Sequence, residues 1–155
     1  MVSKLTPNLQ PERNRPPGGD LLDRIAGRLS YATDQQAIPG LLHGAILRSG
    51  CAHARLKRVD VSRARTMPGV HAVVSARDVP GLNRFGILVR DQPVLCEDRV
   101  RYEGDAIAAV AADTPEQARA ALSEISMDYV PLPVVGDAAT AEQQEPLHQG
   151  GNLLA

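Results

Sequence analysis

The chain has 155 residues, a formal net charge of −1, and only one Phe, three Tyr and no Trp. This length predicts one compact domain with tails, and the domain must build its core from aliphatic side chains. The nearly balanced charge excludes a broad electrostatic field for nucleic acid or an anionic membrane. No basic start precedes an apolar run as in a secretion signal, and no apolar stretch reaches the about twenty residues that span a bilayer. We therefore expect a soluble, cytoplasmic protein.

The N-terminal segment, residues 1–19, contains four prolines and ends in a pair of glycines. Such a segment buries too little apolar surface to offset the entropy of ordering it. We expect a flexible arm here, with an arm docked on a partner subunit as the alternative. Residues 20–26 suit a short helix or an extended lead-in to the domain, which we expect over residues 20–135. A turn is predicted at Ile38–Gly40.

The first half of the domain predicts three strands and two short helices. Leu41–Arg48 is mostly apolar and predicts a buried strand, whereas Arg55–Val61 mixes charged and apolar residues and predicts a strand with one exposed face. Ala64–Met67 favours a short helix that ends at a Pro-Gly stop signal. The valines of Val70–Ser75 favour another strand, and Ala76–Val79 suits one helical turn.

The middle of the chain is less regular. Residues 81–93 follow neither a helical nor a strand period. Val94–Cys96 and Val100–Tyr102 predict two short strands around a turn. Ala106–Ala112 is apolar on both faces, as a central strand must be.

The clearest helix signal begins at Thr114, which is a suitable N-cap. Pro115 fits the first helical position, and Gln117 completes the pattern of a capping box. We expect the apolar face of this helix to pack on a sheet, and the residues concerned are Ala118, Ala121, Leu122 and Ile125 on the helix and Ile107 and Val110 on the sheet.

The C-terminal part predicts a strand over Met127–Val130 and a short helix near Ala138–Gln143. Strands and helices do not alternate strictly along the chain. The sequence therefore predicts an α+β fold, with a mixed sheet and a few short helices.

The cysteines and histidines show no pattern of a metal or nucleophilic site. Cys51 and Cys96 lack zinc-type spacing, so we expect two reduced, partly buried thiols, with a disulfide as the alternative. A nucleophilic pair of Cys51 and His53 lacks an orienting carboxylate, and we expect His53 to tie its loop to backbone groups. His43 and His71 lie within predicted strands, where a structural role is expected, and His148 lies in the tail.

Two further candidates have both a chemical and a structural interpretation. Glu103 and Asp105 form a carboxylate pair that suits acid–base work if burial separates their pKa values, but a solvated turn is the favoured interpretation. Phe85 lies in a loop and suits either a contact with a partner or, as we favour, an aromatic place in the core. The glycines of residues 81–86 do not form a phosphate-binding loop. We assign no catalytic, cofactor-binding or metal-ligating residue.

Several short segments, taken in order, carry a family signal. They are Gly40–Ser49, Ala52–Arg55, Met67–Val70, Asp91–Leu95, Val100–Asp105 and Asp128–Pro133. In order and spacing they resemble the N-terminal a/b hammerhead domain of the molybdopterin-binding subunit of the xanthine dehydrogenase and aldehyde oxidase family. The resemblance covers roughly residues 27–133. One departure is Gly50, which stands where the family usually has a proline.

The resemblance implies an α/β-hammerhead fold and a place in a molybdenum hydroxylase. Members of this family act on purines, aldehydes or N-heterocycles at a molybdenum centre, and electrons leave through iron–sulfur clusters and usually FAD. The family's molybdopterin loops, metal-side glutamine and catalytic glutamate have no counterparts in this sequence. The resemblance therefore implies that these cofactors belong to the full complex and that residues 136–155 are a tail or linker toward a molybdopterin domain.

The implied role is scaffolding and subunit contact, as a non-catalytic domain or a split subunit. The implied partners are a molybdopterin-domain polypeptide and iron–sulfur and flavin subunits, with a homo-oligomer as a further option. The alternatives are a stand-alone interaction module, a truncated product without activity, and an unrelated α+β binding protein. We expect apolar contact surfaces at residues 81–93 and beyond Pro133.

Overall fold

The computed structural model describes residues 19–29, 31, 38–147 and 150–152. They belong to two units, one up to Gly40 and one from Leu41 onward. The first unit contains α1 (Gly19–Ile25), a helix rather than an extended lead-in. Its end is closed by a hydrogen bond from Ala26 N to Leu22 O. The flexible arm predicted for residues 1–19 lies outside the described residues, except for Gly19.

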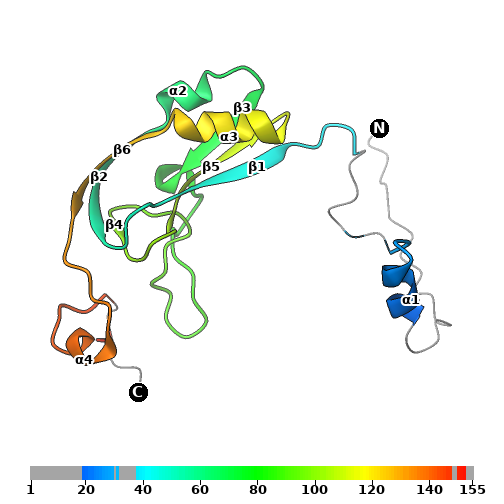
Figure 1. The fold of residues 1–155 in the computed structure, drawn as a ribbon. Helices are drawn as coiled ribbons and strands as arrows, with labels where there is room; N and C mark the ends of the chain where they lie inside the picture. The colour runs from blue at the N-terminus through cyan, green and yellow to red at the C-terminus, as the bar shows by residue number, and fades with distance from the viewer. Residues whose placement is uncertain (1–18, 30, 32–37, 148–149, 153–155) are drawn as a thin grey trace. The chain divides into compact units, whose positions relative to one another are not determined.

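The second unit contains two small antiparallel sheets, which Figure 1 shows together with the helices. The strands are β1 (His43–Arg48), β2 (Ala54–Asp60), β3 (Val70–Ser75), β4 (Arg99–Val100), β5 (Ala106–Ala112) and β6 (Ser126–Pro131). One sheet has the order β1-β5-β3 and the other the order β4-β2-β6. The helical elements are α2 (Ser62–Arg65), the 3-10 turn η2 (Ala76–Asp78), α3 (Pro115–Ser123) and α4 (Ala138–Ala141).

The predicted α+β class is confirmed, although the strands form two antiparallel sheets and not one mixed sheet. None of the helices among the described residues has the length and apolar content needed to cross a membrane. The irregular segment at residues 81–93 contains no strand, only an isolated bridge between Phe85 and Gln92.

Strand β5 lies at the centre of the fold because its two faces belong to two different cores. Ala108, Val110 and Ala112 pack against α3 and α2 in the first core, where their neighbours include Ala64, Ala118 and Ala121. On the other face, Ile107 packs with Leu56, Cys96 and Val100 in the second core. The predicted contact of the α3 face with Val110 is therefore confirmed. The sheet on which α3 packs also contains Ile107, as predicted. Ile107 itself points into the second core, because odd- and even-numbered residues of a strand point to opposite faces.

Helix α3 begins as predicted, but its capping box is incomplete. Thr114 is the N-cap, and its Oγ1 accepts a hydrogen bond from Gln117 N at 3.2 Å. The Gln117 side chain does not return to the backbone of Thr114. It fills the space above Gly69, which has a φ of +78° and no side chain of its own, and its Oε1 is buried without a hydrogen-bond partner.

Two strand predictions need correction. β1 exposes one of its two faces, at Gly44, Ile46 and Arg48, whereas a buried strand was expected, and it lies at the edge of its sheet. Val94–Cys96 is not a strand, because the amides of Val94 and Leu95 bind the side chain of Asn83 and not a neighbouring strand. The predicted strand at Val100–Tyr102 is the two-residue β4, which pairs with β2.

Candidate functional site

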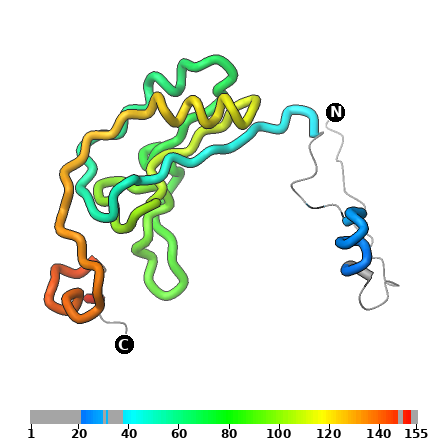
Figure 2. The backbone as a smooth tube through the Cα atoms, viewed as in Figure 1, coloured from blue at the N-terminus to red at the C-terminus, as the bar shows by residue number. Residues whose placement is uncertain are grey.

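The long loop between η2 and β4 exposes several large apolar side chains. We call residues 81–94 the apolar loop, and its exposed apolar side chains are Leu82, Phe85, Ile87, Leu88, Val89 and Val94. Ile87 is fully exposed, and Leu88 is 87% exposed. The loop extends away from the sheets (Figures 1 and 2). Exposed apolar patches of this kind mark contact sites or aggregation hazards.

The side-chain amide of Asn83 fixes the base of the apolar loop. Its Nδ2 donates to Leu95 O at 2.8 Å, and its Oδ1 accepts from Val94 N at 3.0 Å and Leu95 N at 3.1 Å. Above this clamp, Phe85 and Gln92 exchange two backbone hydrogen bonds. The two ends of the loop are therefore held together while its tip carries the apolar side chains.

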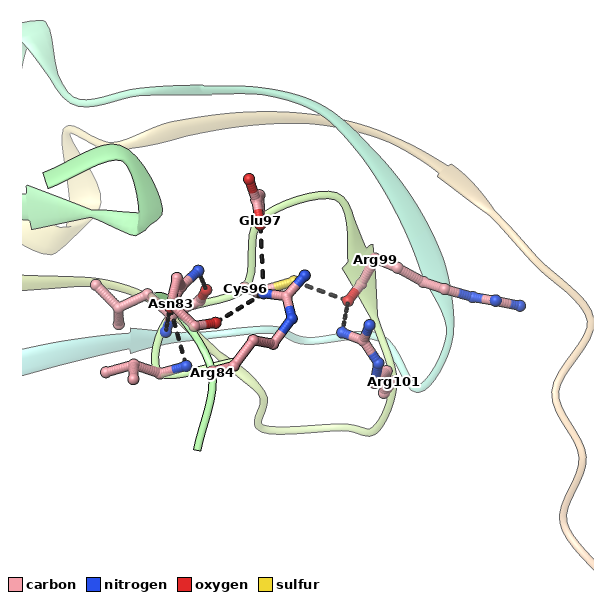
Figure 3. A network of polar contacts seen from close by, with 8 residues as sticks. Asn83, Arg84, Cys96, Glu97, Arg99 and Arg101 are labelled. Carbon is pink, nitrogen blue, oxygen red and sulfur yellow. Dashed lines mark hydrogen bonds and ion pairs between the residues drawn. The ribbon is translucent and has the colours of Figure 1, made fainter. Parts of the chain in front are cut away.

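A second set of bonds ties the loop base to Cys96 of the second core, and Figure 3 shows those that join Arg84 to Glu97 and Cys96 to Arg99. Cys96 N donates to Ala106 O at 2.7 Å, and Cys96 Sγ donates to Arg99 O at 2.9 Å. Arg84 donates to Asn83 O at 2.7 Å and pairs with Glu97 at 3.3 Å. These contacts fix the base of the loop, and the bond from Cys96 N to Ala106 O joins that base to β5.

His53 is held between a cation and a carbonyl. Its Nε2 accepts from Arg99 Nε at 2.9 Å, so Nδ1 carries the proton and donates to Pro133 O. Both ring nitrogens are occupied, which confirms the expected structural role and leaves no nitrogen for activating Cys51. Through these two hydrogen bonds, His53 links β4 to the segment after β6. It lines a hollow of about 430 Å³ that is also lined by residues of the C-terminal tail.

The pair Glu103 and Asp105 does not form an acid–base site. Glu103 is exposed, whereas Asp105 is 4% exposed and accepts from Arg101 N at 3.2 Å. The favoured prediction of a solvated turn is therefore wrong for Asp105. This buried carboxylate fixes the turn, and its backbone O also accepts from Ser49 N at 2.9 Å.

The remaining candidates are separate from one another. In the part of the chain that the structure describes, no three His, Cys, Asp or Glu side chains lie together as a metal site would need. His71 is exposed, and its Nε2 lies 2.7 Å from Asp113 Oδ1. Cys51 and Cys96 are free thiols, as expected. His148 lies outside the described residues.

Phe85 is half exposed, so the expectation that it fills a core position is wrong. Its backbone is committed to the bridge with Gln92 at the surface, while aliphatic residues fill both cores. The role of Asn83 was missed, because its partners lie eleven and twelve residues away and leave no local signal.

We expect Asn83→Ala to loosen the apolar loop without unfolding the domain. The substitution leaves two amides and one carbonyl at the loop base without their partner, which costs about 1–3 kcal/mol. Hydrogen exchange should accelerate at Val94 and Leu95 and stay unchanged at β5. Unchanged exchange at both amides would contradict the clamp.

Cys96 is expected to resist alkylation in the folded protein. Burial, followed by the charge of Asp105, raises the pKa of its thiol to about 12, so at pH 8 it is protonated. Iodoacetamide should modify the half-buried Cys51 first and Cys96 only after denaturation. Peptide mass mapping before and after urea measures this order, and rapid native labelling of Cys96 would contradict its burial.

Residues 26–133 match the family described as "Aldehyde oxidase and xanthine dehydrogenase, a/b hammerhead domain". The chain is 50% identical over 147 residues to a probable xanthine dehydrogenase subunit of Bacillus subtilis, covering 94% of this chain and 19% of that protein. It is 38% identical over 136 residues to the nicotinate dehydrogenase large molybdopterin subunit of Eubacterium barkeri, covering 86% and 32%. The chain thus spans a third or less of these relatives.

Solved structures agree with the sequence match. The aldehyde oxidoreductase from Desulfovibrio gigas superposes with a TM-score of 0.73 at 35% identity, over 81% of this chain and 15% of that one. A Cu,Mo-CO dehydrogenase superposes with a TM-score of 0.73, also at 35% identity, over 79% and 16%. The chain therefore belongs to the aldehyde oxidase and xanthine dehydrogenase family, and its residues 26–133, which contain both sheets, match the a/b hammerhead domain of that family.

Proposed function

We propose that this hammerhead domain is a non-catalytic part of a molybdenum hydroxylase and provides a contact surface for the molybdopterin-binding part. The observation that carries the proposal is the apolar loop, whose exposed tip is held on a polar clamp within a domain of this family. Because the two ends of the loop are already held together, a partner that covers the tip has less of the chain to order. The contact has the same form whether the partner lies on this polypeptide or on another.

The proposed domain limits are residues 20–135 for the hammerhead, with an arm before it and a tail or linker after it. In the tail, Val134, Val135 and Leu147 are further exposed apolar side chains that the partner would cover. The proposed location is the cytoplasm, which two unpaired cysteines suit because that compartment keeps thiols reduced.

Molybdopterin, iron–sulfur and flavin groups belong, in this proposal, to the complete enzyme and to its other subunits. The two cysteines do not offer the ligand set that an iron–sulfur cluster needs. Cys96 is a protonated, buried thiol with its Sγ bound to Arg99 O, and Cys51 has no neighbouring cysteine ligand. The substrate belongs to the class that the complete enzyme accepts, namely purines, aldehydes or N-heterocycles.

The isolated chain should therefore bind no molybdenum, iron or flavin. Elemental analysis and an absorbance spectrum of the purified protein, taken after incubation with each metal and with FAD, measure this. Stoichiometric metal or a flavin band that survives gel filtration would contradict it.

Co-purification tests the contact itself. The chain is expressed with the molybdopterin-domain polypeptide of the same organism, and the two are separated by size-exclusion chromatography. We expect a complex that the Ile87→Asp/Leu88→Asp variant loses, because two charges would enter a dehydrated interface. Ala120→Asp, on the exposed side of α3, is the control and should retain it. A monomer that ignores the partner would contradict the proposal and favour a stand-alone module.

A further inference from the structure

A positively charged groove runs along β2. Two hollows of about 210 and 460 Å³ share the lining residues Lys57, Arg58, Val59, Ser75 and Arg77. Together they form one elongated depression between β2 and the β3–η2 corner, which we call the basic groove. None of residues 81–94 lines it, although one end is bordered by Glu97, which pairs with Arg84 at the base of the apolar loop.

An irregularity in β2 brings two cations into this groove. In the pairing with β6, Leu56 lies opposite Tyr129 and Arg58 opposite Asp128, so Lys57 is the extra residue of a bulge. A bulge re-aims side chains that a regular strand would send to opposite faces. Lys57 and Arg58 consequently line the same depression, although they are adjacent in sequence.

The opposite wall is fixed by a capping box. Asp78 accepts from Ser75 N at 2.8 Å and Ser75 Oγ at 2.9 Å, which holds η2 and with it Arg77 in place. Arg65 from α2 binds Asp78 at 3.0 Å and also donates to Val73 O. The wall that presents Arg77 is therefore braced by three elements.

The charges of the groove do not balance. Each carboxylate that borders it is already paired: Asp60 with Arg58 at 2.6 Å, Asp78 with Arg65 at 3.0 Å and Glu97 with Arg84 at 3.3 Å. Hydrogen bonds from Ser62 and Ser75 hold the pKa values of Asp60 and Asp78 below the ordinary value, so these pairs stay ionised at neutral pH.

Two exposed cations, Lys57 and Arg77, are left without a carboxylate partner among the described residues. This local excess of positive charge occurs in a chain whose net charge is −1.

We propose that the basic groove binds an acidic segment of a partner polypeptide, with carboxylates reaching Lys57 and Arg77. The shape favours an extended peptide over a compact anion, because the groove follows β2 from Leu56 to Asp60 and continues to Ser62 at the start of α2, and a strand advances about 3.3 Å per residue. Arginine and lysine clusters recognise acidic segments through such charge-assisted hydrogen bonds.

The test uses the full chain and a fluorescein-labelled hexaglutamate peptide, with hexaglutamine as the neutral probe. Anisotropy should show binding of hexaglutamate alone, weaker at high salt. Lys57→Gln/Arg77→Gln should weaken it about tenfold, since each exposed charge pair contributes up to about 1 kcal/mol. The matched control Arg55→Gln/Arg119→Gln removes two charges outside the groove and should change it less than about threefold. Ile87→Asp/Leu88→Asp should leave the affinity unchanged, which separates this site from the apolar loop.

Other occupants give distinct results. Equal losses in both double variants would show a general charge effect and overturn the proposal. If inorganic phosphate, added at the same total concentration of negative charge as hexaglutamate, binds and displaces the peptide, the groove is assigned to a small anion instead. Sedimentation that shows a dimer lost in Lys57→Gln/Arg77→Gln would assign it to the acidic tail of a second copy, where Glu142 and Glu145 are exposed. Because Lys57 and Arg77 are exposed, their replacement should leave the melting temperature unchanged.

Discussion

Ala121→Asp should destabilise the domain by about 3 kcal/mol or more, because it places an unpaired carboxylate in a core that contains no cation. Ala121 lies on α3 with no exposed surface, against Val110 and Ala64. A protein of this size has a total stability of about 5–15 kcal/mol, so the loss is a large part of it. Urea unfolding followed by circular dichroism measures the change.

Ala120→Asp is the matched control, since Ala120 is the preceding residue of α3 and is exposed. Both substitutions carry the same loss of helix propensity, about 0.5 kcal/mol, and that contribution cancels in the comparison. The control should therefore unfold within about 1 kcal/mol of the wild type. Equal losses in the two variants would show that the buried face of α3 is not the one described.

Ile107→Ala should cost about 2–4 kcal/mol, through lost apolar burial and the cavity that remains. Ile107 has no exposed surface and packs in the second core with Leu56 and Val100. The control is Ile46→Ala on the outer face of β1, where the side chain is half exposed and the loss should be about 1 kcal/mol. The urea midpoints of the two variants measure this difference. Similar midpoints would contradict the burial of Ile107 in the second core.

The same variant tests whether the two cores unfold together. Ala108 and Val110, on the opposite face of β5 from Ile107, belong to the first core, so β5 contributes to both cores. Ile107→Ala should therefore destabilise the first core as well, and hydrogen exchange in α3 should become faster. Exchange in α3 that ignores Ile107→Ala would show two independent units.

Local signals in the sequence predicted local structure well. Thr114 and Pro115 specify the start of α3 through their own backbone preferences, and the structure begins the helix there. Ala106–Ala112 is apolar on both faces, and it is the central strand of its sheet. The α+β class followed from such elements taken together.

Features that depend on distant partners could not be predicted in the same way. The apolar run at Leu41–Arg48 is compatible with a buried strand and with an edge strand, because the sequence does not say how many neighbours a strand has. Phe85 suits a core as well as a surface. Gln117 satisfied the capping-box pattern, yet its side chain took the space that Gly69 leaves open.

The candidate surfaces divide along the same line. The exposed character of residues 81–93 was predicted from the weak local signals of that segment and is confirmed at Ile87 and Leu88. The clamp at Asn83 forms between the two ends of a loop, and Asp105 is buried where its segment meets Ser49, so neither leaves a local signal in the sequence. The unmatched charges of Lys57 and Arg77 likewise depend on which carboxylates the fold assigns to other arginines.

The order of the strands has a consequence for synthesis on the ribosome. Among the described residues, no two strands that follow each other in sequence pair with each other, and β2 pairs with β6, the last strand of all. Closing such long loops before any contact forms makes folding slow. Until Pro131 has left the ribosome, the edge of β2 that pairs with β6 has no partner strand. Such an unpaired edge can pair with a strand of a neighbouring chain. The domain therefore needs shielding during translation until β6 has emerged.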